Sequence, residues 1–242
     1  MQERPWLKGM LMGRGKIPRW VKLPYTAFVA VLVPFYWRTY GPVNFLWFCD
    51  MALLVTLPAL WLESPFLSSM QAVAIALPQL CWDVDFTAHL AGIHLIGLAD
   101  YMFDPNIPLF VRGLSSFHGW LPLVLLWMVW RLGYDRRALP AQTVAAAVLL
   151  VACFLFTPRP PHPADNPNAA VNVNWVFGPG EETVQTWMAP GLYLALQIVF
   201  YPIVIYLPTH LALGRLFKRR QTTERPGDWH PVRGSAQGER NE

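Results

Sequence analysis

Two ionisable side chains in apolar surroundings are the strongest candidates for chemistry in this sequence. Asp50 lies inside one apolar stretch, and His118 stands at the start of another. An ionised carboxylate inside a membrane is costly unless it is protonated or paired, so such residues mark candidate functional sites. A histidine with a pKa near its usual value of about 6.5 is suited to general base catalysis. We therefore predict that Asp50 and His118 are catalytic residues.

Both residues also have a structural explanation, which stays open at this point. A neutral Asp50 that is hydrogen-bonded to a neighbouring helix would serve packing. His118 opens its apolar stretch in the run Ser115-Ser116-Phe117-His118-Gly119-Trp120. A histidine in that place is also suited to capping a helix or contacting lipid head groups.

Further polar residues gather beyond the apolar stretch that contains Gln79. Gln79 and Asp83 are four residues apart and therefore share one face of a helix. Asp85 and His89 repeat this spacing, and an ordinary hydrated interface is the alternative for each residue taken singly. Their clustering predicts a polar site near one membrane surface. The predicted substrate-binding residues are Asn44, Trp47, Gln79, Asp83, His89 and Trp175.

No metal or cofactor is predicted for this site. Cys49, Cys81 and Cys153 all lie in apolar runs without metal-ligand spacing, so we expect free thiols. The sequence also lacks a tight pair of histidines separated by three residues, the pattern His-x-x-x-His. A metal-dependent enzyme is the alternative, and its candidate ligands are Asp83, Asp85, His89, His94 and His118.

The elements that must position these side chains are membrane helices. The chain is 54% hydrophobic and 14% charged, whereas a soluble domain has about a quarter of charged residues. A membrane span needs about 20 mainly apolar residues. The sequence therefore predicts an all-α, polytopic membrane helical bundle with about six transmembrane helices. These cover residues 21–37, 43–62, 66–82, 116–132, 140–157 and 187–213.

Segment 88–103 is apolar but interrupted by His89, His94 and Asp100. We interpret it as an interfacial or re-entrant helix and not as a seventh span. A seventh span would also move the basic cluster at residues 131–137 to the outer side.

The Lys and Arg residues predict the orientation of the bundle. With the N-terminus inside, 16 of the 19 fall on the cytoplasmic side, and the exceptions are Arg38, Arg112 and Arg159. Positive residues favour the cytoplasmic side, so both termini are predicted to be cytoplasmic, in a bacterial-type inner or plasma membrane. Because the basic residues flank apolar spans, the pI of about 9.1 indicates topology and anionic lipid rather than nucleic acid.

This orientation divides the chain into three parts. Residues 1–20 form a basic cytoplasmic segment without a cleavable signal peptide. Residues 21–213 form the six-span domain, with outer loops at 83–115 and 158–186. Residues 214–242 form a basic, disordered cytoplasmic tail. The loop 158–186, of about 29 residues and rich in Pro and Asn, is longer than most connections, which predicts a lid or binding loop.

Residues 43–50, Val-Asn-Phe-Leu-Trp-Phe-Cys-Asp, resemble the second-span motif of the androgen-induced family of integral-membrane lipid hydrolases. This six-helix family hydrolyses fatty acid esters of hydroxy fatty acids with a Thr in that motif and a His from a later span. Asp50 matches the motif, and His118, followed by Leu121 and Pro122, resembles the family's His. Trp47 stands in place of the Thr. An indole cannot attack an ester, so the resemblance leaves Cys49, Asp50, Ser115 and Ser116 as nearby alternatives.

These observations predict a lipid or lipophilic-ester hydrolase or acyltransferase with its site near the outer interface. Asp50 and His118 are expected to approach one outer-facing cavity covered by the loop 158–186. The alternatives are a non-enzymatic membrane scaffold, a subunit of a membrane complex, or a small transporter, so the sequence does not decide whether the protein is an enzyme. The expected partners are membrane lipids and a second membrane protein.

Overall fold

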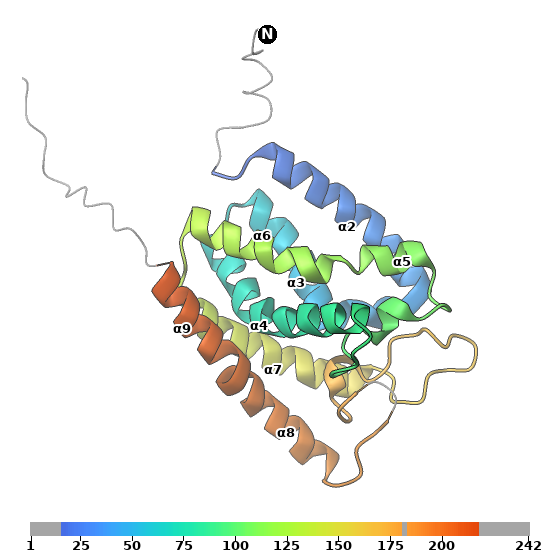
Figure 1. Cartoon of the computed structure of the whole chain (residues 1–242). Helices are drawn as coiled ribbons and strands as arrows, with labels where there is room; N and C mark the ends of the chain where they lie inside the picture. Colours follow the sequence, from blue (N-terminus) through green and yellow to red (C-terminus); the bar gives the residue numbers. More distant parts are fainter. Residues whose placement is uncertain (1–15, 181–182, 218–242) are drawn as a thin grey trace, which may run out of the picture.

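The computed structural model describes residues 16–180 and 183–217 (Figure 1). Within these ranges the chain is entirely helical and has no strand, which confirms the predicted all-α class. The prediction of a disordered tail falls almost wholly on residues 218–242, which lie outside the described ranges, as do residues 1–15 of the basic N-terminal segment.

Twelve helical elements follow one another along the described chain. The α-helices are α2 (Arg19–Tyr40), α3 (Phe48–Trp61), α4 (Pro65–Leu90), α5 (Leu109–Leu114), α6 (Phe117–Leu132), α7 (Ala138–Phe156), α8 (Pro190–Phe200) and α9 (Leu207–Leu216). The short elements are the 3₁₀ helices η1 (Pro42–Leu46), η2 (Asp100–Phe103) and η3 (Val173–Trp175), and a π-helical turn, η4 (Tyr201–Tyr206). Each predicted apolar segment overlaps one α-helix, or the run from α8 to α9 in the last case, and α2 and α4 extend beyond their predicted bounds.

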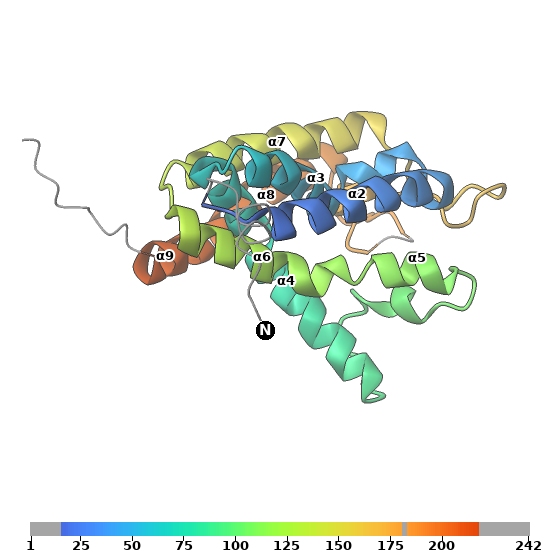
Figure 2. The ribbon, with the colours of Figure 1, turned by 90° about the horizontal axis from the view of Figure 1, so that it is seen from above.

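Helix α4 is the central element of the bundle. It packs against α3, α6 and α7, while α8, η4 and α9 form one continuous rod along α7 (Figure 1). The core between these helices contains fully buried aliphatic side chains such as Leu53, Ile75 and Leu121. Figure 2 shows the last turns of α4 extending beyond the other helices, next to α5. The polar residues at the end of α4 are therefore displaced from the apolar core.

Short sequence signals explain where these helices begin, end and change pitch. The Ser64 side chain accepts a hydrogen bond from the Leu67 amide (3.2 Å) and caps α4, with Pro65 in the first turn. Gly41, with a φ of 83°, ends α2 in a conformation that suits glycine. Pro202 has no amide hydrogen for the α-helical pattern, and the chain adopts the π-turn η4 at that point.

Within residues 16–180 and 183–217, three helices are long and apolar enough to cross a membrane, and not the six that were predicted. They are Leu109–Leu132, Ala138–Phe156 and Pro190–Leu216. Helix α3 has only 14 residues, which at 1.5 Å per residue is roughly 21 Å and short of the about 30 Å of a bilayer core. Helices α2 and α4 are longer, but charged and polar side chains such as Arg19, Lys22, Asp83 and Asp85 interrupt their apolar surface.

The predicted helix over 88–103 is wrong. Helix α4 continues to Leu90, residues 91–99 form turns, and a single 3₁₀ turn, η2, follows. The Asp85 carboxylate accepts hydrogen bonds from the amides of Ile96 (2.8 Å), Gly97 (3.2 Å) and Ala99 (2.9 Å). These bonds satisfy backbone donors that a helix would have used internally, so the segment folds back against the end of α4.

Candidate functional site

Asp50 lies in the first turn of α3 and is only 3% exposed. Its Oδ2 accepts a hydrogen bond from Asn44 Nδ2 (3.2 Å) and a weak one from Cys49 Sγ (3.8 Å). Its Oδ1 is buried and has no hydrogen-bond partner, and no cation of the described chain pairs with it. A buried oxygen without a partner is costly, so this carboxyl group is not explained by local packing.

The loop 158–186 fixes the start of the helix that carries Asp50. Asn174 accepts a hydrogen bond from the Phe48 amide (3.0 Å) and donates one to the Leu46 carbonyl (2.8 Å), so it bridges η1 and α3. Gln197 on α8 donates to the Trp175 carbonyl (3.0 Å) and holds the same loop from the other side. The loop is therefore docked on three elements close to Asp50.

His118 lies in the first turn of α6 with its ring in a fixed orientation. Its Nδ1 is 2.7 Å from the Ser115 carbonyl oxygen, which can only accept, so Nδ1 is inferred to hold the proton. The ring stacks on Trp82 of α4, with a centroid distance of 4.9 Å and an angle of 22°. Nε2 is then the nitrogen with a lone pair, which is the state that a general base needs.

Hydroxyl groups lie between the two predicted catalytic residues. The Tyr36 hydroxyl hydrogen-bonds to Ser115 Oγ (2.5 Å), and the Tyr101 hydroxyl is 3.5 Å from His118 Nδ1. Asp50 interacts electrostatically with both tyrosines. Burial raises the pKa of Tyr101 well above its usual value of 10, and the neighbouring Cys49 and Asp50 raise it further. Tyr101 therefore keeps its proton and remains a hydrogen-bond donor.

Asp50 and His118 thus lie around the same group of hydroxyls but do not contact each other directly. No hydrogen bond joins them among the described residues. A shallow hollow runs along one face of α4, from Asp83 to Ala91, and neither Asp50 nor His118 lines it, so the shared cavity stays a prediction. The predicted loop over the site does cover η1 and the start of α3.

The other predicted substrate-binding residues divide between several places. Asn44 contacts Asp50 directly. Trp47 precedes α3 and packs its ring into the small apolar cluster beneath the loop 158–186. Trp175 lies in that loop with a left-handed backbone (φ 57°), and its indole nitrogen is buried without a partner. Asn44 and Trp47 therefore lie at the start of α3, and Trp175 lies in the loop docked there, while their common role in substrate binding stays a prediction.

The remaining three predicted binding residues lie on α4. Gln79 is 3% exposed, and its Oε1 has no hydrogen-bond partner. Asp83 lies one turn further, with its carboxylate so close to Gly119 that a Cβ there would approach it to 3.2 Å. His89 is ten residues, or nearly three turns, beyond Gln79 and belongs to a second cluster.

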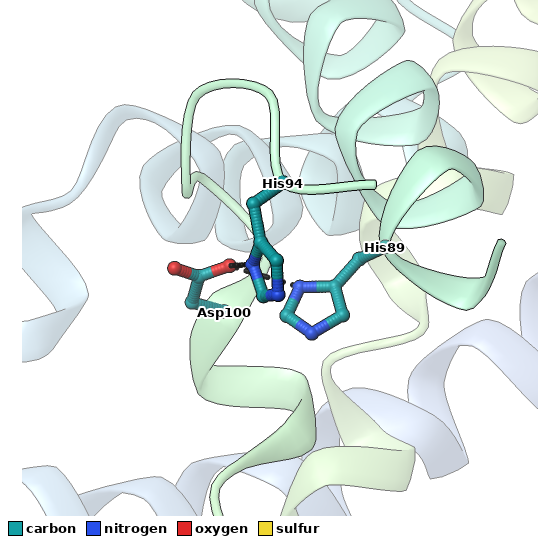
Figure 3. Close-up of side chains that lie close together, drawn as sticks. All are labelled: His89, His94 and Asp100. Atoms are coloured by element: carbon teal, nitrogen blue, oxygen red, sulfur yellow. Dashed lines mark hydrogen bonds and ion pairs between the residues drawn. The ribbon is translucent and has the colours of Figure 1, made fainter. Parts of the chain in front are cut away.

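That second cluster consists of His89, His94 and Asp100 (Figure 3). His89 Nδ1 is 2.9 Å and His94 Nδ1 is 3.9 Å from the same oxygen of Asp100. A row of rings leads from it to His118: His89 stacks on Phe103, and Phe86 and Trp82 complete the row. The metal-ligand set suggested by the sequence is therefore not assembled as a whole, because Asp85 bonds to backbone amides and His118 to Ser115.

Sequence reasoning missed the two tyrosines of the site and the position of Asp100. The first of these is Tyr36. It lies four residues before Tyr40 in an apolar helix, and this spacing of two hydroxyl groups was a signal in the sequence. Tyr101 carried no such pattern, because its proximity to Cys49 and Ser115 depends on how η2 folds back on the bundle. Comparison with known protein families, curated proteins and solved structures gives no match.

Proposed function

We propose that this chain is an integral membrane protein of a bacterial-type inner or plasma membrane in which six helical segments cross the bilayer. They are α2, η1 with α3, α4, α5 with α6, α7, and the rod from α8 to α9. Three of these segments qualify by length and composition alone. The other three pack against them in one bundle, and η1 lengthens the short α3, so that the pair covers residues 42–61.

Exposed apolar faces support a lipid environment. Helix α7 exposes Val144, Val148, Val151 and Leu155, which recur every three or four residues and therefore form one stripe. The rod from α8 to α9 continues such a stripe over its whole length, with Leu192, Leu196, Val199, Ile203, Leu207 and Leu211. Contiguous apolar faces of this size are rare on soluble monomers. Membrane lipids are the proposed partners of these faces.

The distribution of charge supports cytoplasmic termini. At one end of the bundle Lys22 Nζ pairs with Glu63 (2.8 Å), and Arg131 donates to the Lys16 carbonyl (2.7 Å). The start of α2, the turn before α4 and the end of α6 therefore meet there. Because Lys and Arg favour the cytoplasmic side, we assign this basic end to the cytoplasm. The group around Asp50 then lies towards the outer surface.

We propose that the outer site acts on a lipid or lipophilic ester, as a hydrolase or acyltransferase. The observation that carries this proposal is the buried Asp50 Oδ1 without a partner, next to tyrosines that surround an oriented His118. A carboxyl group that packing does not explain, near a histidine with a free Nε2, is the arrangement of an acid–base site. The resemblance of residues 43–50 to membrane lipid hydrolases points to the same class.

The proposed chemistry uses His118 as the base. Nε2 takes a proton from water, or from an acceptor alcohol in acyl transfer, while the oxygen attacks the ester carbonyl carbon. The single bond between the carbonyl carbon and the oxygen of the leaving alcohol then breaks. The alcohol oxygen receives the proton from the imidazolium. Tyr101 remains protonated and donates a hydrogen bond to developing negative charge. Asp50 Oδ1, which has no hydrogen-bond partner among the described residues, remains available to accept a hydrogen bond from the substrate or from water.

A membrane scaffold or complex subunit is the main alternative, and a small transporter is another. In a scaffold, Asp50 and Asn44 would serve only to join η1 to α3 through their hydrogen bond. The scaffold hypothesis and the enzyme hypothesis differ in what they predict for Asp50→Asn, because this variant keeps the side-chain shape and one side-chain oxygen. A scaffold would tolerate it.

The test is turnover of a panel of lipid esters by the purified full chain, together with lipid profiles of a deletion strain. We expect His118→Ala and Asp50→Asn to lower turnover by about 10²–10⁴-fold, the usual contribution of acid–base groups, while membrane expression is unchanged. His162→Ala is the matched control, because His162 Nδ1 also bonds to a backbone carbonyl, that of Ala169 (2.9 Å), but in the outer loop.

Two outcomes would count against the proposal. Full turnover by both Asp50→Asn and His118→Ala would show that the site is assigned wrongly. Loss of expression in both variants, with normal expression of His162→Ala, would favour structural roles and the scaffold. The orientation is tested separately with reporter fusions after Lys218 and within residues 160–185, which should report opposite sides of the membrane.

A further inference from the structure

The cluster at the end of α4 has the composition of a metal site. His89 comes from the last turn of α4, His94 from the following turn segment and Asp100 from the start of η2. One ligand atom from each side chain lies within 4.8 Å of the others. Two imidazoles and one carboxylate are a ligand set for zinc and similar ions. We propose that His89, His94 and Asp100 bind a divalent transition-metal ion of the zinc class.

The distances suit a single ion. Ligand atoms around tetrahedral zinc are about 3.3 Å apart, as follows from zinc–ligand bonds of about 2.0–2.1 Å. The distances from Asp100 Oδ1 to His89 Nδ1 and His94 Nδ1 are 2.9 and 3.9 Å, on either side of this value. His94 is the side chain that must adjust, and it is 70% exposed and therefore unhindered. Figure 3 shows both rings turning a nitrogen towards the same carboxylate.

Neighbouring residues hold two of the ligands in place. The His89 ring lies flat on Phe103, with centroids 3.8 Å apart and an angle of 7°. Gly97 lies against Asp100: a Cβ at Gly97 would come within 3.0 Å of Asp100 Oδ2. The backbone at Gly97 is also fixed by its bond to the Asp85 carboxylate. Ligands that are oriented before binding lose less freedom when the metal arrives.

A simple ion pair between His89 and Asp100 does not account for the whole cluster. An ion pair involves one ring, whereas the rings of His89 and His94 lie 4.2 Å apart and both place Nδ1 near the same Asp100 oxygen. A metal ion accounts for both rings, because each binds it through a neutral nitrogen and any proton on that nitrogen leaves to solvent. Both rings can then share one carboxylate.

The position of the cluster leaves room for a fourth ligand. The side chains of His94 and Asp100 are 70% and 55% exposed, so water reaches the ion from their side. A zinc ion with three protein ligands and one water is typical of catalytic rather than structural sites. Three exposed hydrophobic residues lie near the ligands in the sequence, and such residues suit the boundary between membrane and water. They are Leu90, Ile93 and Ile96. The ion would therefore lie at the membrane surface.

The experiment measures metal binding and does not depend on any enzymatic activity. The full chain is purified in detergent with a histidine-free tag, stripped with a chelator and titrated with Zn²⁺ by calorimetry. We expect one ion per chain and weaker binding at acid pH, because the imidazoles must be neutral. Titration with Co²⁺ should produce the visible absorption bands of a four-coordinate site.

Three variants separate this site from other histidines. His94→Ala removes an exposed ligand and should fold normally; it and Asp100→Asn should weaken Zn²⁺ binding at least about tenfold. Gly97→Ala should weaken it less, by displacing Asp100. His210→Ala is the control, because His210 lies in α9 and bonds to Tyr134 (2.6 Å). Absence of zinc binding by the unmodified chain, or equal affinity of the His94→Ala variant, would overturn the proposal and would leave the proposed ester chemistry unaffected.

Discussion

Glu63 at the basic end of the bundle and Asp50 at the opposite end are both carboxylates in confined surroundings, with different partners. Glu63 accepts hydrogen bonds from the amides of Lys16 (2.7 Å) and Ile17 (3.2 Å) and from Lys22 Nζ (2.8 Å). Asp50 receives only the neutral groups of Asn44 and Cys49 on one oxygen, and none on the other. One carboxylate is compensated by a cation, and the other is not.

This difference indicates a structural role for Glu63 and a functional role for Asp50. Glu63 connects the start of α2 to the turn before α4, and its surroundings favour the charged form. Burial alone raises the pKa of Glu63, but the bonds from Lys22 and the two amides outweigh it, so the pKa lies below its usual value of 4.5. Asp50 gains no such compensation, so stability does not explain its burial. Residues of this second kind are candidates for function.

The largest expected effect comes from exchanging each carboxylate for its amide. Asp50→Asn should lower lipid-ester turnover by about 10²–10⁴-fold and leave the thermal stability of the purified protein nearly unchanged. Glu63→Gln should leave turnover unchanged. Both variants exchange one carboxyl oxygen for an amide nitrogen and keep the side-chain shape, so each is the control for the other. If Glu63→Gln reduced turnover as strongly as Asp50→Asn, the two ends would not differ in function.

The next effect in size concerns stability. Glu63→Gln should destabilise the protein by about 1–3 kcal/mol, because Lys22, only 10% exposed, would lose its counter-charge. Thermal unfolding in detergent, followed by circular dichroism or dye binding, measures this. Asp165→Asn, at an exposed position in the loop 158–186, is the control and should change little. A Glu63→Gln variant as stable as Asp165→Asn would mean that the basic end contributes nothing measurable.

Hydrophobic stretches, with Gly and Pro at their ends, were sufficient to predict the all-α class and the positions of several helices, but not the number of helices able to span a membrane. The segments around α2, α6 and α7 were predicted to within a few residues, since their apolar runs are long and end at signals such as Gly41 and Gly133. The structure of segment 88–103 was not predicted correctly, because it depends on three hydrogen bonds from backbone amides to the Asp85 carboxylate. No periodic pattern in the sequence predicts these bonds. Side-chain bonds of this kind override the local preference.

The site was predictable only as far as single residues were unusual. Asp50 and Asn44 were found because a carboxylate in an apolar run is rare, and they do contact each other. The tyrosines were not, since Tyr is common near membrane interfaces and gives no separate signal. His89 was assigned to the substrate site together with Asp83. It lies further along α4, and the fold of the segment that follows α4 places it next to His94 and Asp100 instead.

A smaller, local effect is expected at Asp85, a third carboxylate that is compensated by backbone amides and not by a cation. Asp85→Asn supplies only one oxygen to three amides, so residues 96–99 should exchange amide hydrogens faster, while α6 and α7 stay protected. Hydrogen exchange read by mass spectrometry measures this, with Asp104→Asn as control. Unchanged exchange at residues 96–99 would show that the segment is held by other contacts.

The smallest expected effect is the response of stability to acid, and it separates the two kinds of carboxylate once more. Because the pKa of Glu63 is lowered by folding, its contribution is fully present above about pH 4.5 and is lost as the pH falls through the folded-state pKa. The protein should therefore lose thermal stability between about pH 5 and pH 3, and Glu63→Gln should lose less over the same window, by about 1 kcal/mol or less because the group is near the surface. Some slope should remain in that variant, since the Asp85 carboxylate also accepts hydrogen bonds from the amides of Ile96, Gly97 and Ala99. Asp165→Asn should retain the full slope. Identical slopes for the unmodified chain and Glu63→Gln would mean that Glu63 is not held as an ion by Lys22, and the contrast with Asp50 would then rest on catalysis alone.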